Sequence, residues 1–230
     1  MSSRKREKEG KGIQELKAKL DAIIQRDQAE YLDRLSTQND PLLAEMEAYA
    51  AEHRVPIADR EVATFLEITA RTSRAQKALE IGMAIGYSVI HLLHGMDQNG
   101  LVVTIEPSDE MIQAASGYLK RADLFNQVRI ERGKALDVMP QLTESFDLLY
   151  IDAVKEEYRQ YLDLGLLRLR TGGVVVVDNL LWGGRVVVRA PVRGECRNGP
   201  YCFWIVFDES VIKRHVDARF RLAVTYGWIE

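Results

Sequence analysis

Short apolar runs alternate with segments of helical periodicity through the middle of the chain, and this alternation limits the possible folds most. Each run is continuous and bounded by turn residues, as expected of a strand buried on both faces. The expected strands cover residues 77–81, 101–105, 128–131, 146–151 and 173–177. The expected helices between them cover 88–94, 109–122, about 134–142, and 156–169. The pattern predicts an α/β fold, in which right-handed βαβ units form a mostly parallel, twisted, Rossmann-like sheet with helices on both faces.

The segment that precedes the first expected strand has helical periodicity instead. Apolar positions recur at helical spacing over 13–35, and a second helix is expected over 41–52, with Asn39 or Asp40 as its cap and Pro41 in its first turn. Residues 1–19 are rich in lysine and arginine. We therefore expect a basic, helical N-terminal extension over 1–40 and one α/β domain over 41–230.

Composition narrows the class of protein. Of the 230 residues, 47% are hydrophobic and 28% are charged, which is typical of a globular domain and unlike disordered or fibrous chains. No apolar stretch is long enough to cross a bilayer, and two cysteines, Cys196 and Cys202, make neither a disulfide framework nor a zinc signature. A cytoplasmic protein without a membrane partner is the expectation.

Polar residues follow two of the expected strands at the point where each strand ends. Asp152 and Lys155 follow the run 146–151, and Asp178 and Asn179 follow the run 173–177. In an open α/β sheet, ligands bind beyond the carboxyl ends of the strands, so these side chains are expected to share one crevice. Two carboxylates and an amide oxygen suit a hard cation such as Mg²⁺. Taken singly, however, each residue could instead cap a helix, form a turn or be solvated.

A glycine-containing turn follows the first expected strand. Gly82 and Gly86 lie between Glu80 and Ser88, where the backbone can approach a ligand closely at the start of a helix. The spacing differs from G-x-G-x-x-G, which disfavours a dinucleotide pyrophosphate site. Glu106 ends the second strand, where a carboxylate can accept hydrogen bonds from both ribose hydroxyls. Together these features indicate a cofactor that contains adenosine.

An ordered series of these motifs resembles a known family. The stretch from about 41 to 186 is similar to the class I S-adenosylmethionine (SAM)-dependent O-methyltransferases of the caffeoyl-CoA and catechol O-methyltransferase type. The closest likeness is to their small bacterial members, some of which methylate 5-hydroxyuridine in tRNA. The residues that carry the resemblance are Glu80-Ile81-Gly82, Gly86-Tyr87-Ser88, Glu106, Gly133-Lys134-Ala135-Leu136, Tyr150 to Lys155, and Gly172-Gly173 through Asp178-Asn179.

The resemblance implies a SAM-dependent methyltransferase domain over 41–230 and a role for each matched residue. Those implied to bind the cofactor are Glu80, Gly82, Gly86, Ser88, Glu106, Ala135 and Asp152. Asp152, Asp178 and Asn179 would bind Mg²⁺ or another divalent cation. Lys155 would be the general base, with Asp152 beside it at the catalytic centre.

The C-terminal part departs from the family pattern. The family usually ends in a strand hairpin with a Gly-Asp-Gly turn, whose last strand is antiparallel to the others. Here a strand is expected over 201–207, a short helix over 210–216 and a strand over 220–226, without that turn. Either 201–207 supplies the missing strand or the sheet has an incomplete edge, and such an edge would favour a homodimer.

The predicted function is metal-dependent methylation of one of two adjacent hydroxyls on a catechol-like or caffeoyl-like small molecule. An arginine-rich segment keeps tRNA 5-hydroxyuridine open as the alternative substrate; it contains Arg185, Arg189, Arg193 and Arg197. Two further alternatives are a nucleotide-dependent oxidoreductase, which the glycine spacing disfavours, and a non-catalytic module that binds SAM. The four polar residues at the strand ends argue against the latter.

Overall fold

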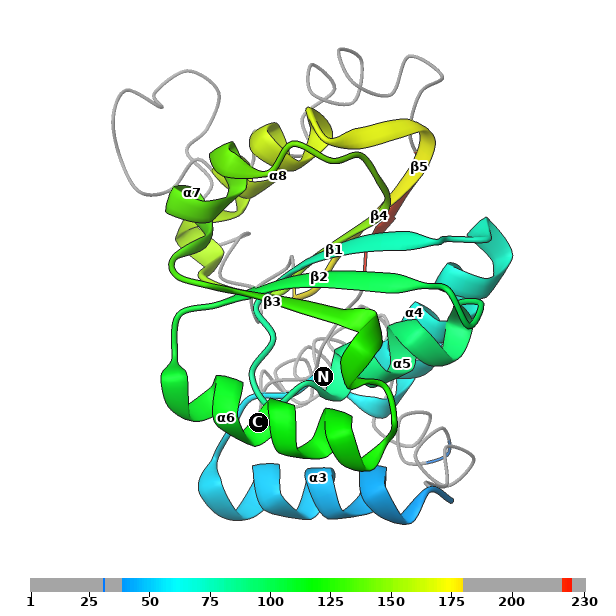
Figure 1. Ribbon diagram of the computed structural model, residues 1–230, viewed down its shortest axis with the longest axis vertical. Coiled ribbons are helices and arrows are strands. Elements are labelled where there is room, and N and C mark those ends of the chain that lie inside the picture. The colour runs from blue at the N-terminus through cyan, green and yellow to red at the C-terminus, as the bar shows by residue number, and fades with distance from the viewer. Residues whose placement is uncertain (1–30, 32–38, 180–220, 225–230) are drawn as a thin grey trace, which may run out of the picture. The chain divides into compact units, whose positions relative to one another are not determined.

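The computed structural model describes Tyr31, residues 39–179 and residues 221–224 (Figure 1). By its internal contacts the chain divides into two units, Met1–Asn39 and Asp40–Glu230. In the first unit Tyr31 is helical, and the rest of the helix expected over 13–35 lies outside the described residues. None of the described helices is both long and apolar enough to cross a membrane.

The second unit is built on a twisted sheet with the strand order β3-β2-β1-β4-β5-β6. Every pairing between these strands is parallel, as predicted. The strands are β1 (Lys77–Ile81), β2 (Leu101–Glu106), β3 (Val128–Arg132), β4 (Phe146–Ile151), β5 (Leu169–Val177) and β6 (Arg221–Val224). The order reverses between β1 and β4, and ligands of doubly wound sheets bind at such a reversal.

Helices cover both faces of this sheet (Figure 1). On one face lie α3 (Pro41–His53), α4 (Arg60–Ser73), α5 (Tyr87–Gly95) and α6 (Asp109–Arg121). On the other lie α7 (Ala135–Val138) and α8 (Tyr158–Leu166). Short 3₁₀ turns complete the connections: η1 (Phe125–Gln127), η2 (Met139–Gln141) and η3 (Lys155–Glu157).

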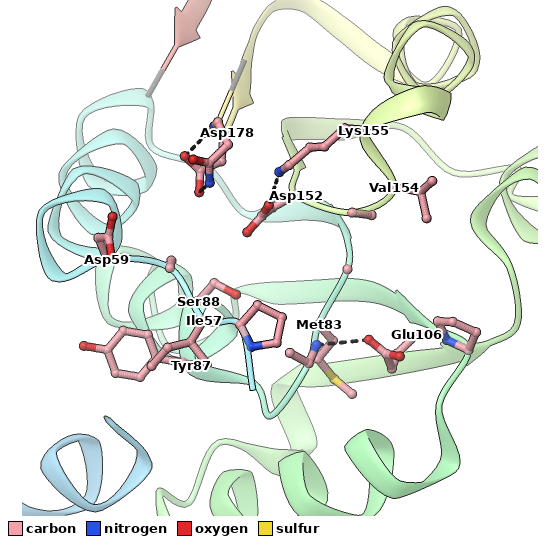
Figure 2. Close-up of a pocket in the computed structure, with 17 residues that line it drawn as sticks. Ile57, Asp59, Met83, Tyr87, Ser88, Glu106, Asp152, Val154, Lys155 and Asp178 are labelled. Atoms are coloured by element: carbon pink, nitrogen blue, oxygen red, sulfur yellow. Dashed lines mark hydrogen bonds and ion pairs between the residues drawn. The ribbon is translucent and has the colours of Figure 1, made fainter. Parts of the chain in front are cut away.

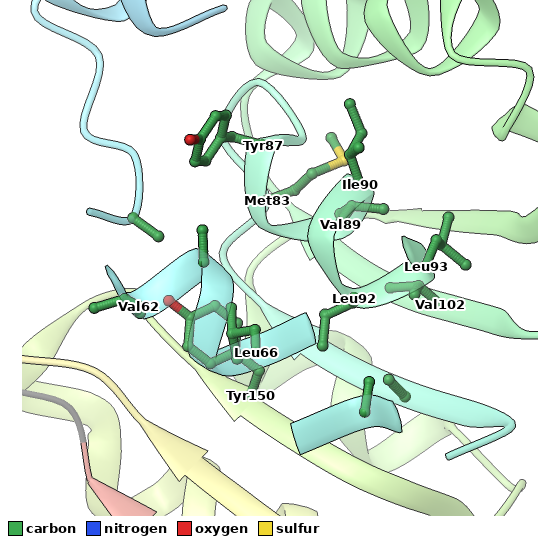
Figure 3. Close-up of a cluster of buried hydrophobic side chains, with 14 of the residues drawn as sticks. Val62, Leu66, Met83, Tyr87, Val89, Ile90, Leu92, Leu93, Val102 and Tyr150 are labelled. Carbon is green, nitrogen blue, oxygen red and sulfur yellow. The ribbon is translucent and has the colours of Figure 1, made fainter. Parts of the chain in front are cut away.

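Two hydrophobic cores hold these layers together, one on each face of the sheet. The first packs the apolar sides of α4 and α5 against β1, β2 and β4; Val62, Leu66, Ile90 and Tyr150 are among its buried members (Figure 3). The second packs the opposite faces of the strands against α7 and α8. Because alternate side chains of each central strand enter opposite cores, these strands read as continuous apolar runs.

Three predicted elements differ in extent from those in the structure. The helix expected over 134–142 is broken into α7 and η2, because Pro140 lacks the N–H that a longer helix would use. The helix expected over 156–169 begins as a 3₁₀ turn and ends at Leu166. Strand β5 starts four residues before the expected Gly173, because Leu169 already pairs with Phe146 ahead of a register shift in β4.

The two helices before β1 begin differently. Asp40 caps α3 through its side chain, which accepts from the backbone N–H groups of Leu42 and Leu43. Asp59 occupies the cap position of α4 but makes no capping hydrogen bond through its side chain.

The C-terminal strand departs from the family pattern within the described residues. Arg221–Val224 falls inside the strand expected over 220–226 and pairs in parallel directly with β5. The described part of the sheet contains no antiparallel strand. The strand expected over 201–207 and the helix expected over 210–216 lie outside the described residues.

Candidate active site

A pocket of about 590 Å³ opens beyond the carboxyl ends of β1, β2, β4 and β5 (Figure 2). Backbone hydrogen bonds continue past the strands and hold their tips side by side: Gly82 N donates to Ile105 O over 3.1 Å, Asp152 N to Ile81 O over 3.0 Å, and Asp178 N to Ile151 O over 3.0 Å. The residues that follow these strands therefore face the same space.

The turn after β1 passes very close to the tip of β4. Gly82 has φ +95°, and a Cβ built on it would lie 2.1 Å from the carbonyl oxygen of Asp152. Only glycine fits there without a shift of the backbone. Ala84, two residues later, also has a positive φ of 47°. The turn thus holds an unfavourable backbone conformation at the edge of the pocket, which is common at ligand-binding sites.

Glu106 is anchored by the backbone of two loops. One carboxylate oxygen accepts from Ala84 N over 3.0 Å, and the other accepts from Ser108 N over 2.9 Å. Each oxygen keeps a further lone pair for a ligand, because a carboxylate oxygen can accept more than one hydrogen bond. Its carboxylate is therefore fixed in direction at the tip of β2.

Lys155, Asp152 and Tyr158 form a polar cluster on the β4 side of the pocket. Lys155 Nζ donates to Asp152 Oδ1 over 2.8 Å (Figure 2). It also donates to the Tyr158 hydroxyl over 2.5 Å. Burial, with the nearby charges of Asp152 and Asp178, raises the pKa of Tyr158, so its hydroxyl stays protonated. The cluster holds the lysine ammonium inside the pocket.

Asp178 and Asn179 extend the polar wall from the tip of β5. Asp178 is buried, and its carboxylate accepts from Asn179 N over 2.7 Å and from Asn179 Nδ2 over 3.2 Å. Asn179 has a left-handed φ of 54°, a conformation that asparagine tolerates. Both carboxylates of the predicted metal site, Asp152 and Asp178, line the pocket.

Most of the predicted site residues line the pocket, and three do not. Those that line it are Gly82, Ser88, Glu106, Asp152, Lys155, Asp178 and Asn179. Glu80 lies behind Ser88 in the sheet, Gly86 packs near Ala115 at the start of α5, and Ala135 belongs to the core under α7. These three are not among the lining residues.

Part of the lining was missed from the sequence. Pro56, Ile57 and Ala58, in the extended segment before α4, contribute apolar lining, as do Met83 and Val154. Asp59 lines the same pocket. A residue before proline favours extended backbone, but no local signal places this segment at the strand tips.

Glu80 is fully buried, and this burial raises its pKa from the ordinary value of 4.5 to about 7, while hydrogen bonds from Ser88 and Thr104 oppose the rise. A raised carboxyl pKa contributes stability that is fully present below the unfolded value and is lost as pH rises through the folded one. Wild type therefore loses stability over this range, whereas Glu80→Gln does not. We expect the unfolding free energy of Glu80→Gln minus that of wild type to be about 3 kcal/mol larger at pH 8 than at pH 4.5. Urea unfolding of both proteins at each pH measures this difference, and a constant difference would contradict it.

Comparisons with known proteins identify the family. Residues 33–207 match the O-methyltransferase family. Catechol O-methyltransferases of Niastella koreensis and Mycobacterium tuberculosis are each 34% identical; the matches cover 67% and 70% of this chain and 72% and 74% of those proteins.

Solved structures agree with this assignment. An O-methyltransferase of Streptomyces achromogenes involved in tomaymycin synthesis, solved in complex with SAM, matches with a TM-score of 0.69 at 28% identity. The match covers 80% of this chain and 82% of that one. The chain therefore belongs to the O-methyltransferase family, whose members transfer the methyl group of SAM.

Proposed function

We propose that this enzyme uses a divalent cation, Mg²⁺ or a similar ion, to methylate one of two adjacent hydroxyls on a small catechol-like ring. The observation that carries the proposal is the sharing of one pocket by two sets of residues. Glu106 and Ser88 suit the cofactor, whereas Asp152, Asp178, Asn179 and Lys155 suit a metal and an acidic hydroxyl. The names of the two catechol O-methyltransferase relatives support the same acceptor class.

The donor set fits a hard divalent cation. Asp152 and Asp178 directly follow the neighbouring parallel strands β4 and β5. A half-turn of the Asn179 amide would exchange its nitrogen and oxygen and add a third oxygen ligand. Within the described residues no group of three or more His, Cys, Asp or Glu is placed to hold a metal. The proposed set contains only two such residues, so it depends on the amide and on the substrate for its other ligands. A bound cation would lower the pKa of the acceptor hydroxyls and fix their direction.

The chain's own residues would align the reactants and remove a proton. Methyl transfer forms a carbon–oxygen bond and breaks the carbon–sulfur bond of the sulfonium in line, so its rate depends mainly on alignment and on deprotonation of the acceptor. Glu106 would hold the ribose, and Lys155 Nζ, in its neutral form, would take the hydroxyl proton. The Tyr158 hydroxyl and Asp152 keep the Lys155 side chain in place.

Replacing Lys155 with methionine is expected to lower kcat by about 100-fold, because general base catalysis contributes on the order of 10²–10⁴. Binding of S-adenosylhomocysteine (SAH) should stay within about threefold of wild type, since alignment of the cofactor does not depend on the ammonium. Steady-state kinetics and calorimetry give the two values. Lys77→Met is the matched control, because Lys77 begins β1 at the end of the strand away from the pocket. A wild-type kcat for Lys155→Met at every pH would remove Lys155 as the base.

A panel of acceptors tests the proposed function. Methyl transfer from labelled SAM is measured with catechol, with phenol, which has a single hydroxyl, and with tRNA that carries or lacks 5-hydroxyuridine. We expect product with catechol and none with phenol. Methylation of hydroxylated tRNA alone, falling steeply with salt, would overturn the small-molecule proposal in favour of tRNA, because phosphate contacts make affinity depend on salt.

A further inference from the structure

Tyr158 has a buried ring and a hydroxyl group that belongs to the polar cluster of the pocket. The ring is part of the second core, where its centroid lies 6.2 Å from that of Tyr161. The hydroxyl oxygen accepts from Lys155 Nζ over 2.5 Å. Because the core is close-packed around the ring, the hydroxyl oxygen is held at a fixed place beside the lysine.

Lys155 donates to two acceptors that come from different parts of the fold. Asp152, directly after β4, accepts through Oδ1 over 2.8 Å, and Tyr158 is the first residue of α8 (Figure 2). A lysine ammonium has three N–H groups, and these two acceptors use two of them. Since Lys155 also lines the pocket, the third position on Nζ is the one that a ligand there can use.

The direction of these hydrogen bonds determines where a neutral lysine presents its lone pair. A neutral amine has two N–H groups and one lone pair. If both N–H groups stay on Asp152 and Tyr158, the lone pair occupies the third position and is open to the pocket. If the Tyr158 hydroxyl donated to Nζ instead, the lone pair would be used within the cluster. A general base must reach the proton that it removes, so only the first arrangement serves the reaction.

Asp152 favours the orientation in which the tyrosine accepts from the lysine. Burial raises the pKa of Tyr158, so the hydroxyl keeps its single proton. Besides accepting from Lys155, the Tyr158 hydroxyl donates to Asp152 Oδ1 over 3.5 Å. The negative charge of this carboxylate attracts the hydroxyl proton, and the lone pairs of the hydroxyl oxygen are then left for Lys155.

We propose that Tyr158 is a positioning residue: by accepting from Lys155, its hydroxyl directs the lone pair of the neutral lysine toward the hydroxyl that is to be methylated. Lys155 takes the proton of that hydroxyl, and the electron pair of the broken O–H bond stays on the oxygen that attacks the methyl group. The inference rests on the proposed function in taking Lys155 as the base. It adds that loss of one buried hydroxyl slows the reaction while cofactor and acceptor still bind.

Tyr158→Phe in the full chain tests the inference, because it removes the hydroxyl and keeps the ring. The ring contact with Lys155 Nζ, 4.8 Å from the centroid, is also kept. We expect kcat with catechol to fall about tenfold, since a misdirected base loses part of the 10²–10⁴ that general base catalysis contributes on the order of magnitude. The KM for catechol and the affinity for SAH should stay within about twofold of wild type. Tyr161→Phe is the matched control: it removes a hydroxyl bonded to Glu157 from the same helix and should leave kcat unchanged.

The same substitution in Lys155→Met shows whether Tyr158 acts through the lysine. In that background Tyr158→Phe should lower kcat no further, because no lone pair is left to direct. An equal loss of kcat in both backgrounds, an unchanged kcat in Tyr158→Phe alone, or loss of SAH binding in that variant would overturn the inference. If Lys155→Met is slow and Tyr158→Phe is not, the inference alone fails. A wild-type kcat in Lys155→Met would instead refute the proposed base, and the inference with it.

Discussion

Asp178→Ala is expected to lower kcat at least about 100-fold at saturating Mg²⁺, while SAH binds within about threefold of wild type. The reason is that the residues proposed to bind the cation are not those proposed to bind the cofactor. Asp178 lies at the tip of β5 beside Asn179, whereas Glu106 and Ser88 lie at the tips of other elements. Loss of one of two carboxylates should weaken the proposed cation site, and a cation bound there would be worth several kcal/mol in the transition state.

Two further variants distinguish loss of the proposed cation site from loss of folding. Asp178→Asn preserves the shape of the side chain and one oxygen, so it should fold as wild type does yet bind Mn²⁺, followed by electron paramagnetic resonance, more weakly. Asp109→Ala, in the first turn of α6, removes an exposed aspartate paired with Arg132 and should leave both kcat and Mn²⁺ affinity unchanged. Wild-type kcat in Asp178→Ala would show that the tip of β5 takes no part in the reaction.

Gly82→Ala is expected to cost about 3 kcal/mol or more of unfolding free energy and to lower activity with it. The new methyl would lie 2.1 Å from the carbonyl oxygen of Asp152 and 3.2 Å from the Ala153 Cβ, and φ +95° is strained for any residue with a Cβ. The tips of β1 and β4 would have to separate to admit it. Since Asp152 lies at that tip, the pocket should lose its geometry as well as its stability.

Gly117→Ala is the matched control for this substitution. Gly117 lies within α6, and a Cβ there would meet nothing within 4 Å. Alanine is the better helix former, so we expect a gain of about 0.5–1 kcal/mol and unchanged activity. Urea denaturation of the three proteins gives the comparison. A Gly82→Ala protein as stable as wild type would mean that the two tips are not in tight contact.

The parts of the fold that the sequence predicted are those set by local pattern. Strands β1 and β4 begin and end at the expected residues, because a strand buried on both faces is a continuous apolar run. The rule that parallel strands carry ligands at their carboxyl ends likewise directed attention to the strand tips. Glu106, Asp152 and Asp178, which follow or end three of these strands, line one pocket in the structure.

The parts that it did not predict depend on contacts between distant segments. The approach of Pro56 and Ile57 to the strand tips follows from the packing of α4 against α5 and has no local signature. The place of Glu80 depends on strand register: it stands opposite Thr104, so its side chain meets two hydroxyls inside the structure. The resemblance assigned Glu80 to the cofactor, and in the structure its carboxylate accepts from Ser88, which lines the pocket.

In the proposed function, one pocket at the strand tips holds both a methyl donor and a cation that aligns the acceptor. The most direct test is transfer of labelled methyl from SAM to catechol after treatment with a chelator, and again after Mg²⁺ is restored. We expect no product in the chelated enzyme and full recovery on addition of the ion. Transfer at the same rate before and after chelation would contradict the account.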